Sequence, residues 1–166
     1  MVTGATVSTV ALGQDGPVIL VGHAWAGVVI TEAGNDPRVA GLVCVAAFAP
    51  DDGQSAGDAT KPYPPTPGLG EAKPDSAGYL SLTRKGVAED FVPDLPAAER
   101  AIVYATQGPW NSRALSEKVT SAAWKTKPSW FIVVNDRMIS PEYERAAAKH
   151  INATTTRLNS SHVAML

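Results

Sequence analysis

Residues 18–27 decide the fold, and they read VILVGHAWAG. The first four are a continuous branched apolar run, which is typical of a strand buried on both faces of a parallel sheet. The small residues Gly22 and Ala26 flank position 24, and a helix-like segment follows from Val28. A sharp strand-to-helix turn through small residues projects the central side chain outward, as in a nucleophile elbow. An ordinary strand–helix junction that uses glycine for packing is the alternative. The central position holds Ala24, which has no hydroxyl.

Strand-like and helix-like patterns alternate on either side of this turn. They predict strands over 18–21, 41–48, 129–134 and 154–158, a short helix ending near Gly13, and helices over 28–33, 97–107, 112–122 and 141–151. The helix over 141–151 has Ser140 as its cap, with Glu142 and Glu144 in its first turn. Prolines and glycines crowd the segment 51–74, which indicates an irregular excursion. We therefore expect one α/β domain over 1–166: a doubly wound, mostly parallel sheet with a cap-like insertion at about 51–125.

Composition excludes several classes of function. The chain has 166 residues and a formal net charge of −2, with no run of lysine or arginine, so neither nucleic acid nor an anionic membrane surface is an expected partner. No apolar stretch reaches the roughly 18 residues of a membrane span, and the N-terminus does not resemble a signal peptide. The single cysteine, Cys44, suits a reducing cytoplasm, where we expect the protein. No His, Asp or Glu cluster has metal-ligand spacing, and we expect neither a metal nor another cofactor.

Two polar residues follow later strands in an order that suggests nucleophilic catalysis. Asp136 follows the predicted strand over 129–134, and His162 follows the one over 154–158. The order elbow, acid, histidine is that of α/β-hydrolases, in which the carboxylate accepts a hydrogen bond from the imidazole and fixes its tautomer. The backbone N–H of Trp25, at a helix N-terminus, would contribute to an oxyanion hole. The side chains of His23 and Trp25 are expected to line the pocket.

Each of these residues has a less specific interpretation. Taken alone, Asp136 is a strand-end turn residue, and His162 is a histidine whose hydrogen bonds are satisfied. Asp51, which follows the strand over 41–48, is an alternative triad acid. Cys44 lies inside that strand and is best interpreted as a small packing residue rather than a nucleophile.

The sequence also resembles a known family. Five segments carry the resemblance: residues 18–27, 31–43, 46–55, 127–139 and 160–166. They are similar to the bacterial α/β-hydrolase family related to plant salicylate-binding esterases and hydroxynitrile lyases. The resemblance implies that Ala24 occupies the position of the serine nucleophile, that Asp136 is the acid and that His162 is the base. It also implies that the insertion at about 51–125 is a cap that shapes the pocket.

The chain departs from that family in two ways. The family begins with earlier strands and a His-Gly motif that completes the oxyanion hole, and it continues into a closing helix after the histidine loop. None of the three histidines precedes a glycine, so we expect the N-terminal strands and the last helix to be missing from this chain. An open apolar edge would remain at the strand over 18–21, and homo-oligomers are therefore expected.

These features support two main hypotheses of function. In the first, the chain is a serine hydrolase, of the esterase or lactonase type, for a small neutral ester or acyl compound, and Ala24 leaves it inactive or very weak. In the second, it is a non-catalytic ligand-binding or interaction protein that keeps the pocket. A lyase that uses a histidine base on the same scaffold is a third possibility, which Ala24 also disfavours.

Overall fold

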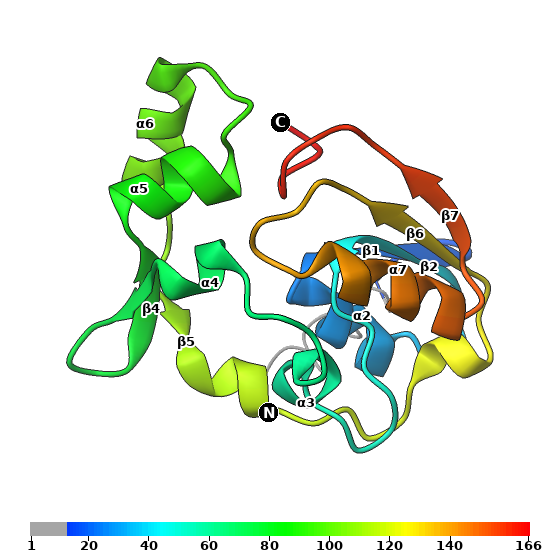
Figure 1. The fold of residues 1–166 in the computed structure, drawn as a ribbon. Coiled ribbons are helices and arrows are strands. Elements are labelled where there is room, and N and C mark those ends of the chain that lie inside the picture. The colour runs from blue at the N-terminus through cyan, green and yellow to red at the C-terminus, as the bar shows by residue number, and fades with distance from the viewer. Residues whose placement is uncertain (1–12) are drawn as a thin grey trace.

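A computed structural model describes residues 13–166 of the chain. Its main sheet has four strands, β1 (Val18–Ala24), β2 (Val39–Ala47), β6 (Ser129–Val133) and β7 (Thr154–Arg157). They lie in the order β1-β2-β6-β7, and every neighbouring pair is parallel (Figure 1). This arrangement confirms the predicted α/β fold and its four strands. The helix expected to end near Gly13 lies outside the described residues.

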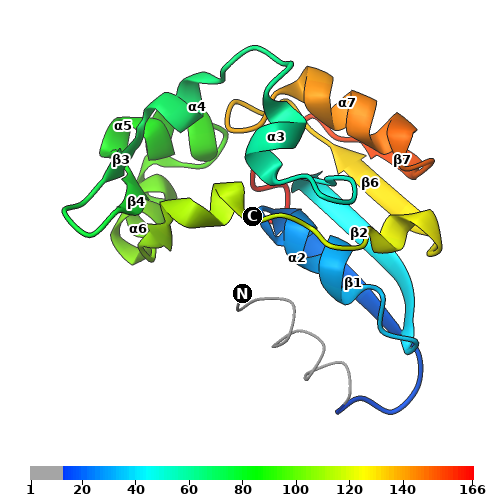
Figure 2. The same cartoon turned by 90° about the horizontal axis from the view of Figure 1, so that it is seen from below.

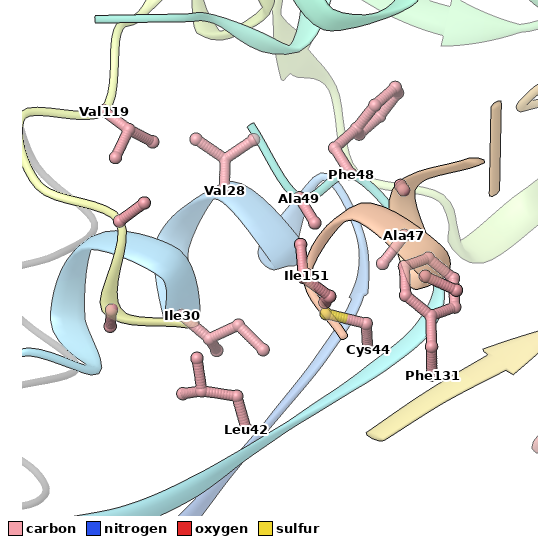
Figure 3. Packing of buried hydrophobic residues seen from close by; sticks show 14 of the residues in the cluster. Val28, Ile30, Leu42, Cys44, Ala47, Phe48, Ala49, Val119, Phe131 and Ile151 are labelled. Atoms are coloured by element: carbon pink, nitrogen blue, oxygen red, sulfur yellow. The ribbon is translucent and has the colours of Figure 1, made fainter. Parts of the chain in front are cut away.

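Two helices pack on one face of this sheet. Helix α2 (Ala26–Ala33) follows β1, and helix α7 (Pro141–His150) lies between β6 and β7 in the sequence. Ser140 caps α7, because its hydroxyl accepts a hydrogen bond from the N–H of Tyr143, as the sequence predicts. Branched and aromatic side chains from both helices and from the central strands form one core, which includes Val28, Ile30, Leu42, Phe131 and Ile151 (Figure 3).

The opposite face of the sheet carries exposed apolar side chains. Ile19 and Val21 alternate with buried neighbours along β1, and Trp130 lies on β6. Val21 is 63% exposed, so this face of β1 is not covered within the part of the chain that the structure describes. The prediction that this strand is buried on both faces is therefore wrong for residues 13–166. Because β1 is also an edge strand of the sheet within this range, its outer backbone groups and its apolar side chains lie together.

A second layer lies beside the carboxyl ends of the strands and contains most of the segment between β2 and β6 (Figure 2). It includes a three-stranded antiparallel sheet in the order β3-β4-β5. Helix α3 (Ala56–Thr60) lies before this layer, beside the main sheet. The elements of the layer are α4 (Pro67–Gly70), β3 (Ala72–Pro74), β4 (Tyr79–Leu82), α5 (Arg84–Gly86), a π-helical turn (Val87–Phe91), α6 (Ala97–Thr106) and β5 (Trp110–Asn111). Two 3₁₀ turns, Ser112–Ser116 and Ala123–Lys125, lead from β5 back to β6. We call the segment from α4 to Ser116 the cap.

Two predictions for this region are wrong. The helix expected over 112–122 exists only as the 3₁₀ turn Ser112–Ser116, because the residues after it pair with another segment: the N–H of Val119 donates to the carbonyl of Gln54 at 2.9 Å. The small sheet β3-β4-β5 forms where only irregular chain and helices were expected. In both places the pairing partner is distant in the sequence, and such contacts override local propensity.

Candidate active site

The turn after β1 has the backbone geometry of an elbow. Ala24 ends β1 with a φ of 52°, in the left-handed region that costs a residue other than glycine about 1–3 kcal/mol. The carbonyl of Ala24 accepts a hydrogen bond from the N–H of Phe48 at 3.1 Å, which links the turn to the end of β2. At Gly27 a Cβ atom would lie 2.0 Å from the carbonyl oxygen of Phe48. At Gly22, one of the small residues that suggested an elbow, a Cβ atom would lie 2.7 Å from the carbonyl oxygen of Ala26, so this glycine is needed for close backbone contact.

Asp136 and His162 lie against each other in the protein interior. The distance from Nδ1 of His162 to Oδ2 of Asp136 is 2.6 Å, and both side chains are almost fully buried. The other oxygen of Asp136 accepts the N–H of Met138, also at 2.6 Å, which fixes the carboxylate plane. Burial acts to raise the pKa of Asp136, but the hydrogen bond and charge of His162 outweigh it and hold that pKa below its ordinary value. The carboxylate can therefore orient the imidazole and support a positive charge on it.

His23 holds the loop that carries His162. Its Nε2 atom lies 2.9 Å from the backbone carbonyl of His162, and since a carbonyl only accepts, His23 carries a proton on Nε2. The two imidazole rings are 4.6 Å apart. Burial and the proximity of His162 lower the pKa of His23, so this ring stays neutral beside the second histidine. His23 thus contacts His162 as well as the pocket.

Trp25 joins the elbow to the cap. It is the N-cap residue of α2, so its backbone N–H lies at the helix N-terminus beside Ala24. Its indole N–H donates to the carbonyl of Ala114 at 2.9 Å, and its ring packs edge-on against Trp110. The elbow and the cap are therefore linked by the side chain next to Ala24.

The candidate site opens into a cavity of about 790 Å³. His23, Ala24, Trp25 and His162 line it together with side chains from the cap. The other side chains of the lining are mostly apolar and include Leu69, Leu82, Val87, Phe91, Val103, Trp110 and Met138. No aspartate, glutamate, lysine or arginine of residues 13–166 lines the cavity. Ions lose their hydration in such surroundings at a large cost, so the cavity suits a neutral, largely apolar molecule.

The cap is attached to the two loops that carry Asp136 and His162. Arg137 forms an ion pair with the buried Asp90 at 2.7 Å. The backbone N–H of Ser161 donates to Asp94 at 2.8 Å, and the hydroxyl of Thr66 donates to the carbonyl of Met138. Phe91 lies on the cavity side of this attachment, with its ring 5.3 Å from the ring of His162. The loops and the cap are thus one hydrogen-bonded unit.

The alternative candidates lie elsewhere. Asp51 binds Lys125 and His150 at the protein surface, so it is not placed to orient His162. Cys44 is buried in β2, and burial raises the pKa of its thiol to about 12. Within residues 13–166 no group of three or more His, Cys, Asp or Glu side chains could hold a metal ion. None of the helices in the same range is long and apolar enough to cross a membrane.

Sequence reasoning missed the environment of Glu144. The sequence placed this residue in the first turn of α7 as a partner of the helix dipole, whereas its side chain is fully buried behind Asp136. Phe91 was missed as well, because the π-helical turn that carries it has no sequence signal of its own. The signals around Glu144, namely the Ser140 cap and the acidic first turn, indicated only a helix start.

Comparison with known proteins agrees with the α/β fold described above. The model of the family described as "Alpha/beta hydrolase family" matches residues 3–166. None of the curated proteins gives a significant match. Sixty-three chains of solved structures do match, and they include esterases and hydrolases related to plant enzymes.

Three of these structures illustrate the likeness. One is an extracellular α/β-hydrolase from a Paenibacillus species, described as sharing structural and functional homology with tobacco salicylic acid binding protein 2. It is 21% identical in sequence, with a TM-score of 0.79, and the match covers 98% of this chain and 72% of the Paenibacillus chain. A polyneuridine aldehyde esterase is 14% identical, with a TM-score of 0.76 over 98% and 72%. A pyrethroid hydrolase from Sphingobium faniae is 20% identical, with a TM-score of 0.73 over 95% and 68%. At these identities the likeness concerns the fold.

Proposed function

Because the chain belongs to the α/β-hydrolase family, we propose that its cavity binds a small neutral ester or related acyl compound, and that Ala24 leaves it without the nucleophile for hydrolysis. The observation that carries this proposal is the buried pair of Asp136 and His162, 2.6 Å apart, because His162 lines the same cavity as Ala24. The esterases and the pyrethroid hydrolase among the structural relatives support an ester as substrate.

Restoring a hydroxyl at position 24 would complete a triad. The carboxylate of Asp136 accepts a hydrogen bond from Nδ1–H of His162, which leaves Nε2 free to take the hydroxyl proton as that oxygen attacks the ester carbonyl. The N–H of Trp25 would then donate to the developing oxyanion. His162 would return the proton to the departing alcohol, and water would release the acyl group by the same steps.

The lining of the cavity supports a neutral substrate. A carboxylate or ammonium group in the cavity would lose its hydration without a charged partner among the described residues. An apolar acyl or alcohol group would instead contact Val87, Phe91 and Trp110 of the cap. Specificity is therefore expected to follow size and shape more than charge.

As it stands, the chain lacks the attacking atom. In a serine hydrolase, loss of the nucleophile costs about a million-fold in turnover, and binding is kept. This observation favours the second candidate, a non-catalytic binding protein. The two candidates differ in one respect: a hydrolase scaffold becomes catalytic when a hydroxyl is restored at position 24, whereas a binding protein does not.

The Ala24→Ser variant separates these candidates. We expect it to hydrolyse short-chain 4-nitrophenyl esters, with turnover lost again in Ala24→Ser/His162→Ala. The unaltered chain is expected to bind the same esters without burst or turnover. A folded Ala24→Ser protein that binds the esters but does not cleave them would reject the hydrolase scaffold in favour of a binding role.

A further inference from the structure

Behind the pair of Asp136 and His162 lies a second carboxyl group, that of Glu144. It is on α7, one helical turn from the cap residue Ser140, and its side chain has no exposure to solvent. One oxygen, Oε2, accepts the backbone N–H of Val134 at 3.2 Å. For the other, Oε1, no donor is found among residues 13–166. A fully ionised carboxylate in this position would keep a buried oxygen without a hydrogen bond, which is costly.

Asp136 is the neighbour that Glu144 contacts. The two carboxyl groups interact, and each shifts the pKa of the other: Asp136 raises that of Glu144, and Glu144 lowers that of Asp136. Two ionised carboxylates side by side in the interior repel each other, and neither has a donor for the other, so one of them must carry a proton. Asp136 already receives hydrogen bonds from His162 and Met138 on its two oxygens, and both contacts favour its charged form. The proton therefore belongs on Glu144.

The charges around Glu144 agree with this assignment. Burial is the largest effect, and together with the hydrogen bond and the negative charge of Asp136 it raises the pKa of Glu144 to about 9. The N–H of Val134 and the more distant positive charge of Arg145 act in the opposite direction but do not outweigh it. The neighbouring Tyr143 is neutral, since burial raises the pKa of its phenol and outweighs the hydrogen bond from the N–H of Ala49, which acts to lower it.

We propose that Glu144 is a neutral carboxylic acid that donates a hydrogen bond to Asp136, and so acts as a positioning residue behind the histidine. The chain of contacts runs from the ring of His162 through the carboxylate of Asp136 to the acid of Glu144. A second negative charge at this place would hold a proton on the imidazole and remove its capacity to act as a base. A neutral donor fixes the carboxylate and leaves one negative charge behind His162. The value of this arrangement for catalysis rests on the proposed function, but the protonation state of Glu144 does not.

A pH-dependent unfolding experiment on the unaltered chain tests this directly. An acid that keeps its proton in the folded state, but loses it on unfolding, makes the protein less stable as pH rises between the two pKa values. The variant Glu144→Gln has an amide that can donate to Asp136 and accept from Val134, and it does not titrate. The unfolding equilibrium constant of the parent relative to that of Glu144→Gln is therefore expected to rise about tenfold per pH unit between pH 5 and 8. Glu142→Gln is the matched control, because Glu142 is an exposed glutamate in the same helical turn; for it the ratio should stay constant.

Two results would overturn the proposal. A constant ratio for Glu144→Gln across this range means that Glu144 releases its proton at the same pH in the folded and unfolded chains. If Glu144→Gln does not fold, the carboxyl ¹³C signals of the parent give the answer. We expect one glutamate carboxyl signal to keep the chemical shift of a protonated acid at pH 7. If every glutamate carboxyl signal shows the shift of an ionised group below pH 6, the proposal is contradicted. Neither measurement uses ester turnover, so a failed Ala24→Ser assay leaves the proposal standing.

Discussion

The indole N–H of Trp25 donates to the backbone carbonyl of Ala114, 2.9 Å away, and this bond ties the elbow to the cap across 89 positions of sequence. The residue beside Ala24 therefore also links the elbow to the cap side of the cavity. Ligand binding and the attachment of the cap should consequently depend on the same side chain.

Trp25→Phe keeps an aromatic ring but removes this donor. We expect the free energy of unfolding to fall by about 1 kcal/mol, the usual net value of one hydrogen bond, and binding of 4-nitrophenyl butyrate to weaken. Urea denaturation and calorimetric titration measure the two effects. Trp124→Phe is the control: Trp124 donates to the carbonyl of Pro50 at 3.0 Å and does not line the cavity, so it should lose stability without losing affinity. Equal loss of affinity in both variants would contradict this assignment.

Gly27→Ala is expected to be strongly destabilising. Its Cβ atom would lie 2.0 Å from the carbonyl oxygen of Phe48, which is backbone and cannot move away without displacing the end of β2. Overpacking of this kind costs about 3 kcal/mol or more. Gly70→Ala serves as the control, because nothing lies within 4 Å of the added atom. Thermal unfolding of the two variants should differ clearly, and similar melting temperatures would show that the elbow tolerates expansion.

Cys44 is expected to be unreactive in the folded protein. Burial raises the pKa of its thiol to about 12, so almost no thiolate forms at pH 8, and the side chain is 2% exposed. Ellman's reagent should react slowly with the native chain and rapidly with the urea-unfolded chain. Fast reaction of one equivalent under native conditions would show that β2 opens locally.

Asp51 should contribute stability that disappears in acid. The hydrogen bond from Lys125, followed by that from His150, lowers the pKa of Asp51 from 3.8 to about 2. The contribution is therefore present above about pH 4 and is lost as the pH falls toward 2. Since both partners are partly exposed, we expect Asp51→Asn to cost about 1 kcal/mol at pH 7 and almost nothing at pH 2.

Urea denaturation across this pH range measures the difference between Asp51→Asn and the parent. Asp15→Asn, in the exposed turn before β1, is the control and should follow the parent at every pH. A difference for Asp51→Asn that does not shrink in acid would mean that the ion pairs are not its cause.

The exposed side of β1 is expected to promote self-association. Ile19 and Val21 are 48% and 63% exposed on an edge strand of the main sheet. Val21→Lys should shift the protein toward the monomer, because two copies that pair along β1 would have to bury the charged lysine between them. Light scattering after size exclusion, over a range of concentrations, measures this. Thr156→Lys on β7, the other edge strand, is the control, and a parent that is monomeric throughout would refute the expectation.

Local patterns were sufficient to predict the α/β core. The buried runs over 18–21, 41–48 and 129–134 correspond to β1, β2 and β6 within a few residues, and Ser140 caps α7 as expected. A strand buried on both faces, as most of β2 is, must be continuously apolar, and a helix start needs an acceptor for its free N–H groups. The run over 18–21 is apolar as well, although one face of β1 is exposed. These requirements act over a few residues and are therefore visible in the sequence.

The cap was not predictable in the same way. Its strands β3, β4 and β5 are two to four residues long, and each is defined by its partner rather than by its own pattern. The segment over 112–122 had the composition of a helix but pairs instead with residues 54–55. Short segments have weak propensities, and a few distant hydrogen bonds decide their structure.

The sequence by itself determined that a small-residue turn holds Ala24, and that Asp136 and His162 follow it in hydrolase order, because chain order and residue type are written in it. Only the tertiary structure decided that Asp136 rather than Asp51 meets His162, that His23 holds the carbonyl of His162, and that Glu144 lies buried behind Asp136. The physical reason is burial. The protonation and hydrogen-bond partners of an ionisable group depend on what surrounds it in space, and those neighbours come from elements far apart in the chain.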